Sequence, residues 1–456
     1  MERPGRKLFL AHALLPEGWA RDVLLTLRDG WIEAVERGAS PPADAERLGV
    51  AVPGLPDVHS HAFQRGMAGL AERGGPEGDH FWSWREAMYG FLGRLDPADV
   101  EAVSALAYME MLERGFTAMG EFHYLHHAPD GRPYANPAEL CERVAAAAAA
   151  TGIGLTLLPV LYAHGGFGGA QPTPGQRRFV LGLDGFAALR DAAARAVAGL
   201  PDARVGVAPH SLRAVTADEL TALLAMSPGV PVHVHAAEQV REVEDCLAAT
   251  GMRPVQWLLA HAPLDDRWCV IHATHVTDAE LDGLAASGAV AGLCPVTEAN
   301  LGDGIFPAVG FVARGGRFGM GTDSNVCISA AGELRALEYS QRLRDRARNR
   351  LAPGAGSTGR RLFEDAARGG ARALGRRIGA IAPGLRADLV TLDAEHPALL
   401  GRQGDAWLDA WIFAAEGGCV RDVFVGGRRV VAEGRHVARA EIVATWASRA
   451  GRLLRG

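Results

Sequence analysis

The sequence predicts an α/β protein in which a (β/α)8 TIM-type barrel is joined to a small β-sandwich built from both ends of the chain. Apolar strand-like runs and helical segments alternate eight times through the middle of the chain, which is the order that such a barrel requires. At both ends, short strand-like runs are separated by turns instead. We therefore expect residues 1–52 and 383–456 to form the two parts of the β-sandwich and residues 53–382 to form the catalytic barrel.

The barrel strands are expected where apolar runs of six to nine residues recur, with amphipathic or Ala-rich helices between them. An open doubly wound sheet is the alternative, but it would place a Gly-x-Gly-x-x-Gly turn after its first strand, and the sequence has no such turn there. The expected strands are 51–58, 116–122, 154–162, 203–209, 230–236, 268–273, 289–294 and 316–322, and the clearest helices are 97–114, 137–151, 185–199 and 277–287.

The two ends of the chain have the pattern of antiparallel strands. Residues 23–27 and 31–35 flank a short turn, which is typical of a β-hairpin. The apolar run 8–15 follows a basic start, but it contains a histidine and lacks a small-x-small cleavage site, so a strand is favoured over a signal peptide. Near the other end, strands are expected at 387–392, 420–425 and 428–431.

The composition is typical of a soluble globular protein, with 48% hydrophobic and 22% charged residues. A net charge of −6 offers no basic surplus for nucleic acid or an anionic membrane, and no run approaches the roughly 20 apolar residues of a membrane helix. Six scattered cysteines without a Cys-x-x-Cys pair favour a reducing, cytoplasmic compartment. Lys7 is the only lysine, which excludes pyridoxal chemistry and a lysine-bridged pair of metals.

Several expected strands end in residues that can bind a metal. The first ends at His59-Ser60-His61, whose imidazoles share one face because residues i and i+2 of a strand point the same way. The fifth ends with His235, and Asp323 follows the eighth. Three imidazoles and a carboxylate suit Zn²⁺, or Fe²⁺ as a second choice. We expect His59, His61, His235 and Asp323 to bind one divalent metal per chain.

The same strand ends supply residues for hydrolysis. A bound metal would acidify water near neutral pH, and Asp323 beside that water can accept a proton. Glu238, three residues after His235, can carry a proton to a leaving nitrogen. His272, at the end of the sixth strand, can hold the nucleophile or the charge that develops at the attacked carbon.

Two further histidines compete for these positions. His233 points to the same face as His235 and is an alternative ligand, although His235 is preferred because it lies at the strand end. His275 competes with His272 in a similar way.

Two connections are longer than a barrel needs. Gln64–Leu95 follows the first strand and contains Phe81-Trp82-Ser83-Trp84-Arg85, whereas Ala163–Val180 follows the third strand and is rich in Gly and Pro. Long loops in compact domains are often lids or binding loops. We expect the aromatic segment to contact substrate or a partner subunit, and an inert insertion is the alternative for the second loop.

The order of the His-x-His pair, the later histidines and Asp323 resembles the amidohydrolase superfamily over nearly the whole chain. Segment 381–390 looks like the return of that superfamily's chain to its small domain, and the His-x-x-Glu after the fifth strand is similar to its mononuclear deaminases. More specific motifs resemble the formimidoylglutamate deiminases, which act in histidine degradation. These motifs lie at 53–70, 81–85, 121–124, 208–213 and 272–275.

This resemblance implies hydrolysis of N-formimidoyl-L-glutamate to N-formyl-L-glutamate and ammonia by a homodimer. Because the substrate has two carboxylates, arginine forks are suited to bind it, and Arg85 and Arg213 are candidates on different sides of the barrel mouth. Which residue takes the α- and which the γ-carboxylate stays open. The residues alone would also allow expulsion of the other nitrogen to give formamide, and it is the resemblance that implies release of ammonia. The resemblance implies that the carboxylates are bound by Gln64, Arg85, Tyr124, His210 and Arg213.

Two other functions compete with this interpretation. A deaminase of a purine, pterin or other heterocycle would need an aromatic stacking wall, which the segment 81–84 could supply. A barrel that serves only as a scaffold would have lost some of its metal ligands, whereas all of the expected ones are present here. A metal assay distinguishes the scaffold from the enzymes.

Overall fold

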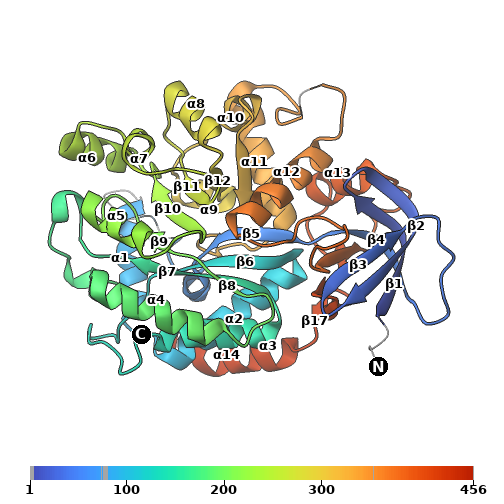
Figure 1. The fold of residues 1–456 in the computed structure, drawn as a ribbon, viewed down its shortest axis with the longest axis horizontal. Coiled ribbons are helices and arrows are strands. Elements are labelled where there is room, and N and C mark those ends of the chain that lie inside the picture. Colours follow the sequence, from blue (N-terminus) through green and yellow to red (C-terminus); the bar gives the residue numbers. More distant parts are fainter. Residues whose placement is uncertain (1–4, 73, 75–80, 353, 455–456) are drawn as a thin grey trace.

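Two β-sheets organise the chain, and each takes its strands from a different part of the sequence. The computed structural model describes residues 5–72, 74, 81–352 and 354–454. The middle of the chain forms a parallel barrel surrounded by helices, and both ends meet in a second sheet beside it, on the right of Figure 1. The predicted fold class is therefore confirmed.

The barrel sheet has the strand order β10-β11-β12-β13-β5-β6-β7-β8, and β9 also pairs with β7. Its neighbouring strands are parallel. Isolated parallel bridges pair Val207 with Val232 and Ser211 with His235, and these bridges close the barrel. The strands are β5 (Leu55–Ser60), β6 (Phe116–His123), β7 (Gly154–Leu161), β8 (Arg204–Val205), β9 (Ala208–Pro209), β10 (Val232–Ala236), β11 (Trp268–His272), β12 (Val290–Leu293) and β13 (Arg317–Met320).

Helix starts are set by local capping. α2, α5 and α8 each begin at a capping box, in which an Asp or Thr side chain accepts from the third helical N–H and the acidic residue there bonds back. The helices of the described ranges are α1 (Phe81–Leu92), α2 (Pro97–Glu113), α3 (Glu139–Thr151), α4 (Leu183–Val197), α5 (Ala217–Ala225), α6 (Val240–Thr250), α7 (Pro254–His261), α8 (Asp278–Ser287), α9 (Pro295–Leu301), α10 (Ala308–Ala313), α11 (Ala330–Asp345), α12 (Thr358–Ala373), α13 (Asp405–Phe413) and α14 (Arg439–Leu454), with short 3-10 helices η1 (Ala62–Met67), η2 (Phe167–Gly169) and η3 (Pro174–Gln176).

The second sheet combines the two ends of the chain in the order β17-β16-β15-β14-β4-β1-β2-β3. An apolar cluster that includes Leu8, Leu25 and Phe424 packs on it, which gives this sheet a core of its own. Its strands are β1 (Arg6–Leu15), β2 (Gly18–Arg28), β3 (Trp31–Glu36), β4 (Glu46–Pro53), β14 (Leu389–Leu392), β15 (Val420–Val425), β16 (Arg428–Ala432) and β17 (Arg435–His436).

The junction between the two sheets lies at Gly54. The apolar run 51–58, expected as one strand, is divided there: β4 ends at Pro53 in the terminal sheet, and β5 begins at Leu55 in the barrel. A Cβ on Gly54 would lie 2.1 Å from Oγ1 of Thr117 in β6, so only glycine fits between the sheets. Apolarity alone does not reveal this break, because both halves of the run are buried.

Two further segments differ from the sequence-based expectation. The aromatic part of the long connection 64–95 is the helix α1 rather than a loop, while residues 73 and 75–80 of that connection lie outside the described residues. In the segment 383–456, expected in the β-sandwich, the final helix α14 packs against α2 of the barrel (Figure 1). None of the described helices combines the length and apolarity that a membrane crossing needs.

Candidate active site

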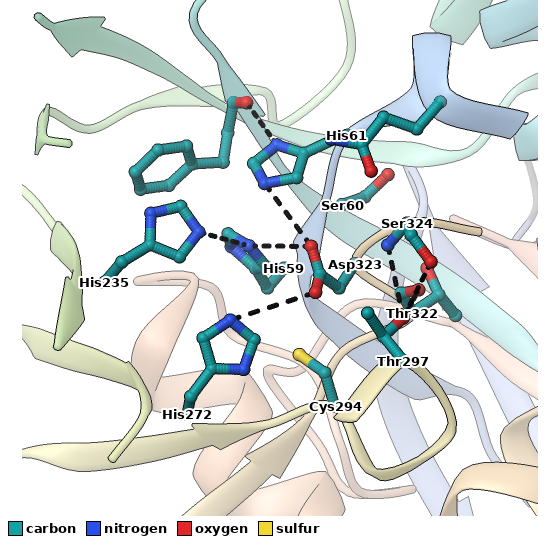
Figure 2. Close-up of polar contacts among 12 residues, drawn as sticks. His59, Ser60, His61, His235, His272, Cys294, Thr297, Thr322, Asp323 and Ser324 are labelled. Carbon is teal, nitrogen blue, oxygen red and sulfur yellow. Dashed lines mark hydrogen bonds and ion pairs between the residues drawn. The ribbon is translucent and has the colours of Figure 1, made fainter. Parts of the chain in front are cut away.

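Four strands deliver the expected site residues to one end of the barrel. His59 lies on β5 and His61 just beyond it, His235 lies on β10, His272 ends β11, and Asp323 comes three residues after β13. The strands are parallel, so their carboxyl ends meet at the same mouth, as in other barrels of this type. Figure 2 shows the imidazoles turned toward the Asp323 carboxylate.

Backbone conformation turns two of these side chains inward. His272 has a φ of 66° and Asp323 a φ of 45°, both in the left-handed region that L-residues rarely adopt. Such strain persists only where surrounding structure enforces it, and it concentrates at functional sites. At His272 this conformation coincides with the end of β11, whereas Asp323 adopts it three residues after β13, and both side chains line the cavity at the mouth of the barrel.

Nitrogen and oxygen donors converge on one point. Nε2 of His59 lies 3.0 Å from Nε2 of His235. Nε2 of His59 and Nε2 of His61 each lie 3.4 Å from Oδ1 of Asp323. None of these four residues is more than 5% exposed. The structure therefore brings together all four residues expected to bind the metal.

Hydrogen bonds orient two of the rings toward that point. Nδ1 of His61 donates to the carbonyl of Phe122 at 2.9 Å, and Nδ1 of His235 donates to the carbonyl of His210 at 3.0 Å. With Nδ1 protonated, the lone pair of Nε2 in each ring faces the cluster. A backbone carbonyl on the outer ring nitrogen is the usual support of a metal-binding histidine.

The charges of the cluster fit a divalent cation. Burial lowers the pKa of His59 to about 3 and also lowers the pKa values of His61 and His235, so these imidazoles are neutral. Although burial opposes its charge, contacts led by His59 hold the pKa of Asp323 below its ordinary value. Neutral imidazoles and an ionised carboxylate are the forms that bind metals.

The competing histidines point elsewhere. His233 is buried on β10, but its Nε2 bonds to the carbonyl of Ala373 at 2.8 Å at the end of α12. Nε2 of His275 bonds to the carbonyl of Asp303 at 2.8 Å. The Nε2 atom of each of these two histidines is therefore bonded to a backbone carbonyl. His235 and His272 are the histidines that lie at the cluster.

Glu238 and His272 lie beside the cluster. Nε2 of His272 is 3.8 Å from Oε1 of Glu238 and 3.8 Å from Oδ2 of Asp323. Burial raises the pKa of Glu238 to about 7, which suits a group that both takes and gives a proton. Although burial opposes its charge, Glu238 and then Glu298 raise the pKa of His272 to about 10.

Two buried carboxylates that the sequence analysis did not identify support the site. Oδ2 of Asp57 accepts from Oγ1 of Thr322 at 2.6 Å, and its Oδ1 accepts from the backbone of His59 at 3.1 Å, which ties β5 to the end of β13. Oε1 of Glu298 lies 3.2 Å from Nδ1 of His272. Asp57 could have been found, because it shares the strand face of His59 and His61. Glu298 lies in the first turn of a separate helix, α9, and gives no such signal.

The five residues expected to bind substrate line one cavity next to the cluster. Nε of Arg85 and Nε of Arg213 are buried without a hydrogen-bond partner among the described residues. Nε2 of Gln64 donates to the hydroxyl of Tyr124 at 2.9 Å. The residues shared by the expected set and the cavity wall are Gln64, Arg85, Tyr124, His210 and Arg213.

Helix α1 supplies one wall of this cavity. Phe81, Trp84, Arg85, Met88 and Tyr89 of α1 all line it. The aromatic segment is thus a helix that lines the cavity, and its contact with substrate or a partner subunit stays a prediction. Arg85 reaches the cavity from α1, whereas Arg213 reaches it from the connection between β9 and α5.

A buried set of neutral imidazoles and a carboxylate, at the carboxyl end of a (β/α)8 barrel, defines a metal-dependent hydrolase. The sequence model of the amidohydrolase family matches residues 50–430. The chain belongs to this family. A second model, described as the N-terminal domain of the formimidoylglutamate deiminase HutF, matches residues 7–49.

Individual relatives cover almost the whole chain. A formimidoylglutamate deiminase of Pseudomonas aeruginosa is 51% identical over 98% of this chain and 99% of its own length. The crystal structure of an amidohydrolase from Brucella melitensis is 53% identical, has a TM-score of 0.95, and is matched over 98% of this chain and 100% of that one. A 5-methylthioadenosine/S-adenosylhomocysteine deaminase of Natronomonas pharaonis is 30% identical over 93% of this chain and 92% of its own.

Proposed function

We propose that the protein hydrolyses N-formimidoyl-L-glutamate to N-formyl-L-glutamate and ammonia, a step of histidine degradation. The observation that carries this proposal is a pair of arginines, Arg85 and Arg213, in the cavity next to the cluster of metal-binding donors. Their buried Nε atoms have no hydrogen-bond partner within the described part of the chain. Two guanidinium groups match a substrate with two carboxylates. The relative from Pseudomonas aeruginosa that bears this activity in its name supports it.

The metal is proposed to be one Zn²⁺ per chain, with Fe²⁺ as the alternative. His59, His61, His235 and Asp323 would hold it, because their donor atoms converge and their charge states suit a dication. When bound, such a metal makes water nucleophilic near neutral pH. A single site agrees with the lack of any lysine beyond Lys7 that could bridge two metals.

The remaining chemistry falls to the side chains. Hydrolysis moves both protons of one water to the imino nitrogen, the first when the oxygen bonds to the formimidoyl carbon and the second when the adduct collapses to the formyl C=O and the C–N bond to ammonia breaks. Asp323 would accept the first proton at its carboxylate while Glu238 delivers its own to the nitrogen. Glu238 would then carry the hydroxyl proton of the adduct to the leaving nitrogen, and transfer of the proton held by Asp323 to Glu238 restores both groups. His272, placed 3.8 Å from both carboxylates, would stabilise the charge that develops between them.

The substrate's carboxylates are assigned to the outer part of the cavity. Arg85 and Arg213 would each bind one through charge-assisted hydrogen bonds. Gln64, Tyr124 and His210 would add neutral donors; burial and then Arg213 hold the pKa of His210 well below its ordinary value, so this ring is uncharged. Trp84 and Phe81 would cover the aliphatic chain.

We also propose that the protein is a cytoplasmic homodimer. All six cysteines are unpaired, which suits a reducing compartment. The homodimer rests on the family resemblance and on the partly exposed Trp82 and Trp84 of α1. A molar mass of one chain in solution at micromolar concentration would contradict it.

The decisive experiment measures ammonia release from N-formimidoyl-L-glutamate together with metal content on the same sample. Rapid ammonia release with about one metal per chain is the expected result. Release of formamide would mean that the other C–N bond breaks. A metal-loaded protein that releases neither product would contradict the proposal, and adenine- or guanine-type amines would then be tested, because the cavity also has aromatic walls.

A further inference from the structure

A second cavity lies directly outside the catalytic cavity and shares part of its wall. Arg85, Tyr162 and Arg213 line both cavities. Arg241 and Asp245 of α6 complete the outer one, which we call the outer cavity, and the side chain of Arg241 is 65% exposed. The two arginines assigned to the substrate's carboxylates therefore separate the catalytic cavity from an outer cavity that solvent reaches.

Trp82 holds two arginines together at this place. The guanidinium carbon of Arg85 lies 4.4 Å from the centre of the Trp82 ring, and that of Arg241 lies 4.9 Å from the same ring. Each distance is within the range of a cation–π contact. The two charges are thus no farther apart than about one Debye length, roughly 10 Å at 0.1 M salt, and act on an approaching anion together.

Acidic groups neutralise the arginines only in part. Oδ2 of Asp245 lies 3.7 Å from Nε of Arg241, and Oε2 of Glu238 lies 3.9 Å from Nη2 of Arg213, both longer than a hydrogen bond. Nε of Arg85 and Nε of Arg213 have no partner among the described residues. Glu242 also interacts with Arg213, so what extends from the catalytic cavity to the outer one is a row of cations with unused donors rather than a net positive charge.

We propose that the outer cavity is an anion subsite where a carboxylate of the incoming substrate first binds, with Arg241 as its outermost cation. From there the carboxylate passes to Arg85 and Arg213, which both cavities share. The ligand class is a small dicarboxylate, so the inference rests on the proposed function. Arg241 belongs neither to the cluster of metal-binding donors nor to the wall of the catalytic cavity. Its role is to bind the incoming substrate, and it takes no part in the hydrolysis.

The test compares Arg241→Gln with wild-type holoenzyme over a range of salt concentrations. At low ionic strength we expect kcat/KM for N-formimidoyl-L-glutamate to fall roughly 3- to 10-fold with kcat unchanged, and the difference to shrink as salt is added. Arg241→Lys should restore most of the loss, because a point charge suffices for capture. Asp245→Asn, which removes the opposing charge, should raise kcat/KM at low salt.

A matched control removes an arginine at the other end of the barrel. Arg368 is 66% exposed and lies near Arg317, the first residue of β13 and thus remote from the mouth. Arg368→Gln changes the net charge equally and should leave kcat/KM and its salt dependence unchanged. If Arg241→Gln behaves like Arg368→Gln, or lowers kcat instead of kcat/KM, the proposal is wrong.

Failure of the proposed function can be separated from failure of the subsite. If wild-type protein releases no ammonia, stopped-flow tryptophan fluorescence with N-formyl-L-glutamate still measures dicarboxylate association, and Trp82→Phe identifies the signal from the outer cavity. Slower association in Arg241→Gln would support the subsite without any turnover. Equal association rates in Arg241→Gln and wild type would overturn it.

Discussion

Nδ1 of His272 lies 3.2 Å from Oε1 of Glu298, and this contact decides what the other nitrogen of the ring faces. The same Glu298 oxygen accepts from the backbone of Cys294 at 2.9 Å, at the start of α9, so the carboxylate is itself held in place. The ring therefore presents Nε2 to Glu238 and Asp323. A buried carboxylate behind a site histidine fixes the orientation of the ring, and here it also favours the charged form of His272.

Replacing Glu298 should impair turnover without emptying the metal site. We expect Glu298→Ala to lower kcat by roughly 10- to 100-fold, because His272 loses its support. Glu298→Gln retains an acceptor oxygen but not the charge, so its kcat should lie between that of Glu298→Ala and that of the wild type. The measurement is kcat and KM together with metal content. Glu395→Ala, at an exposed position of a loop, is the control; metal loss in Glu298→Ala would indicate a structural role instead.

The two arginines of the catalytic cavity should act mainly on substrate affinity. Arg85→Met or Arg213→Met removes a charged hydrogen bond worth about 1.5–3 kcal/mol, so KM should rise roughly 10- to 100-fold with metal retained. Arg195→Met, in the exposed last turn of α4, should behave as wild type. Unchanged KM in both cavity variants would remove these arginines from substrate binding.

Metal removal should abolish turnover reversibly. His59 and His235 place two Nε2 atoms 3.0 Å apart, an arrangement that a shared cation stabilises. Chelation should therefore eliminate ammonia release and lower the unfolding temperature, because a ligand bound only to the folded state stabilises it. Adding back one equivalent of Zn²⁺ should restore both. His235→Ala should bind less metal from the outset, and full activity in a metal-free sample would contradict the assignment.

The barrel and its metal-binding residues could be predicted from the sequence, because the pattern of residues that are neighbours in the chain indicates them. His59 and His61 alternate on one strand, and each later site residue closes its own apolar run, so the donor set and the barrel follow from local pattern. The close packing at Gly54 could not be predicted from the local pattern, because the side chain that leaves no room for a Cβ there belongs to Thr117, 63 positions away in the chain.

Long-range partners explain the remaining differences. Glu298 reaches His272 from another element, and nothing within either segment indicates that contact. The aromatic run of α1 has helical as well as loop-like composition, and its position over the cavity depends on residues from several strands. Helix α14 follows a β-rich stretch, yet its basic residues find acidic partners on α2. Such pairings are decided by tertiary packing rather than by local propensity.

The docking of α14 should weaken in acid. Nη1 of Arg449 donates to Oδ1 of Asp99 at 3.0 Å, and Arg452 bonds to the other oxygen of this buried carboxylate. Although burial opposes its charge, hydrogen bonds from Arg452 and from the backbone of Asp96 hold the pKa of Asp99 below its ordinary value. A carboxyl whose pKa is lower in the folded state stabilises the fold above its unfolded pKa, near 4, and this stabilisation is lost as the pH falls through the folded value.

Hydrogen exchange measured against pH checks this relationship. Amides of residues 439–454 should lose protection as the pH falls below about 4, before those of α4, which carries none of these pairs. In Asp99→Asn, the amides of α14 should already be less protected at pH 7. The loss should be only about 1 kcal/mol, because Arg452 is half exposed and water screens its ion pair. Lowering the pH should change the protection of this variant little further. If α14 in Asp99→Asn loses protection in acid as strongly as in the wild type, the ion pairs with Asp99 do not hold this helix on the barrel.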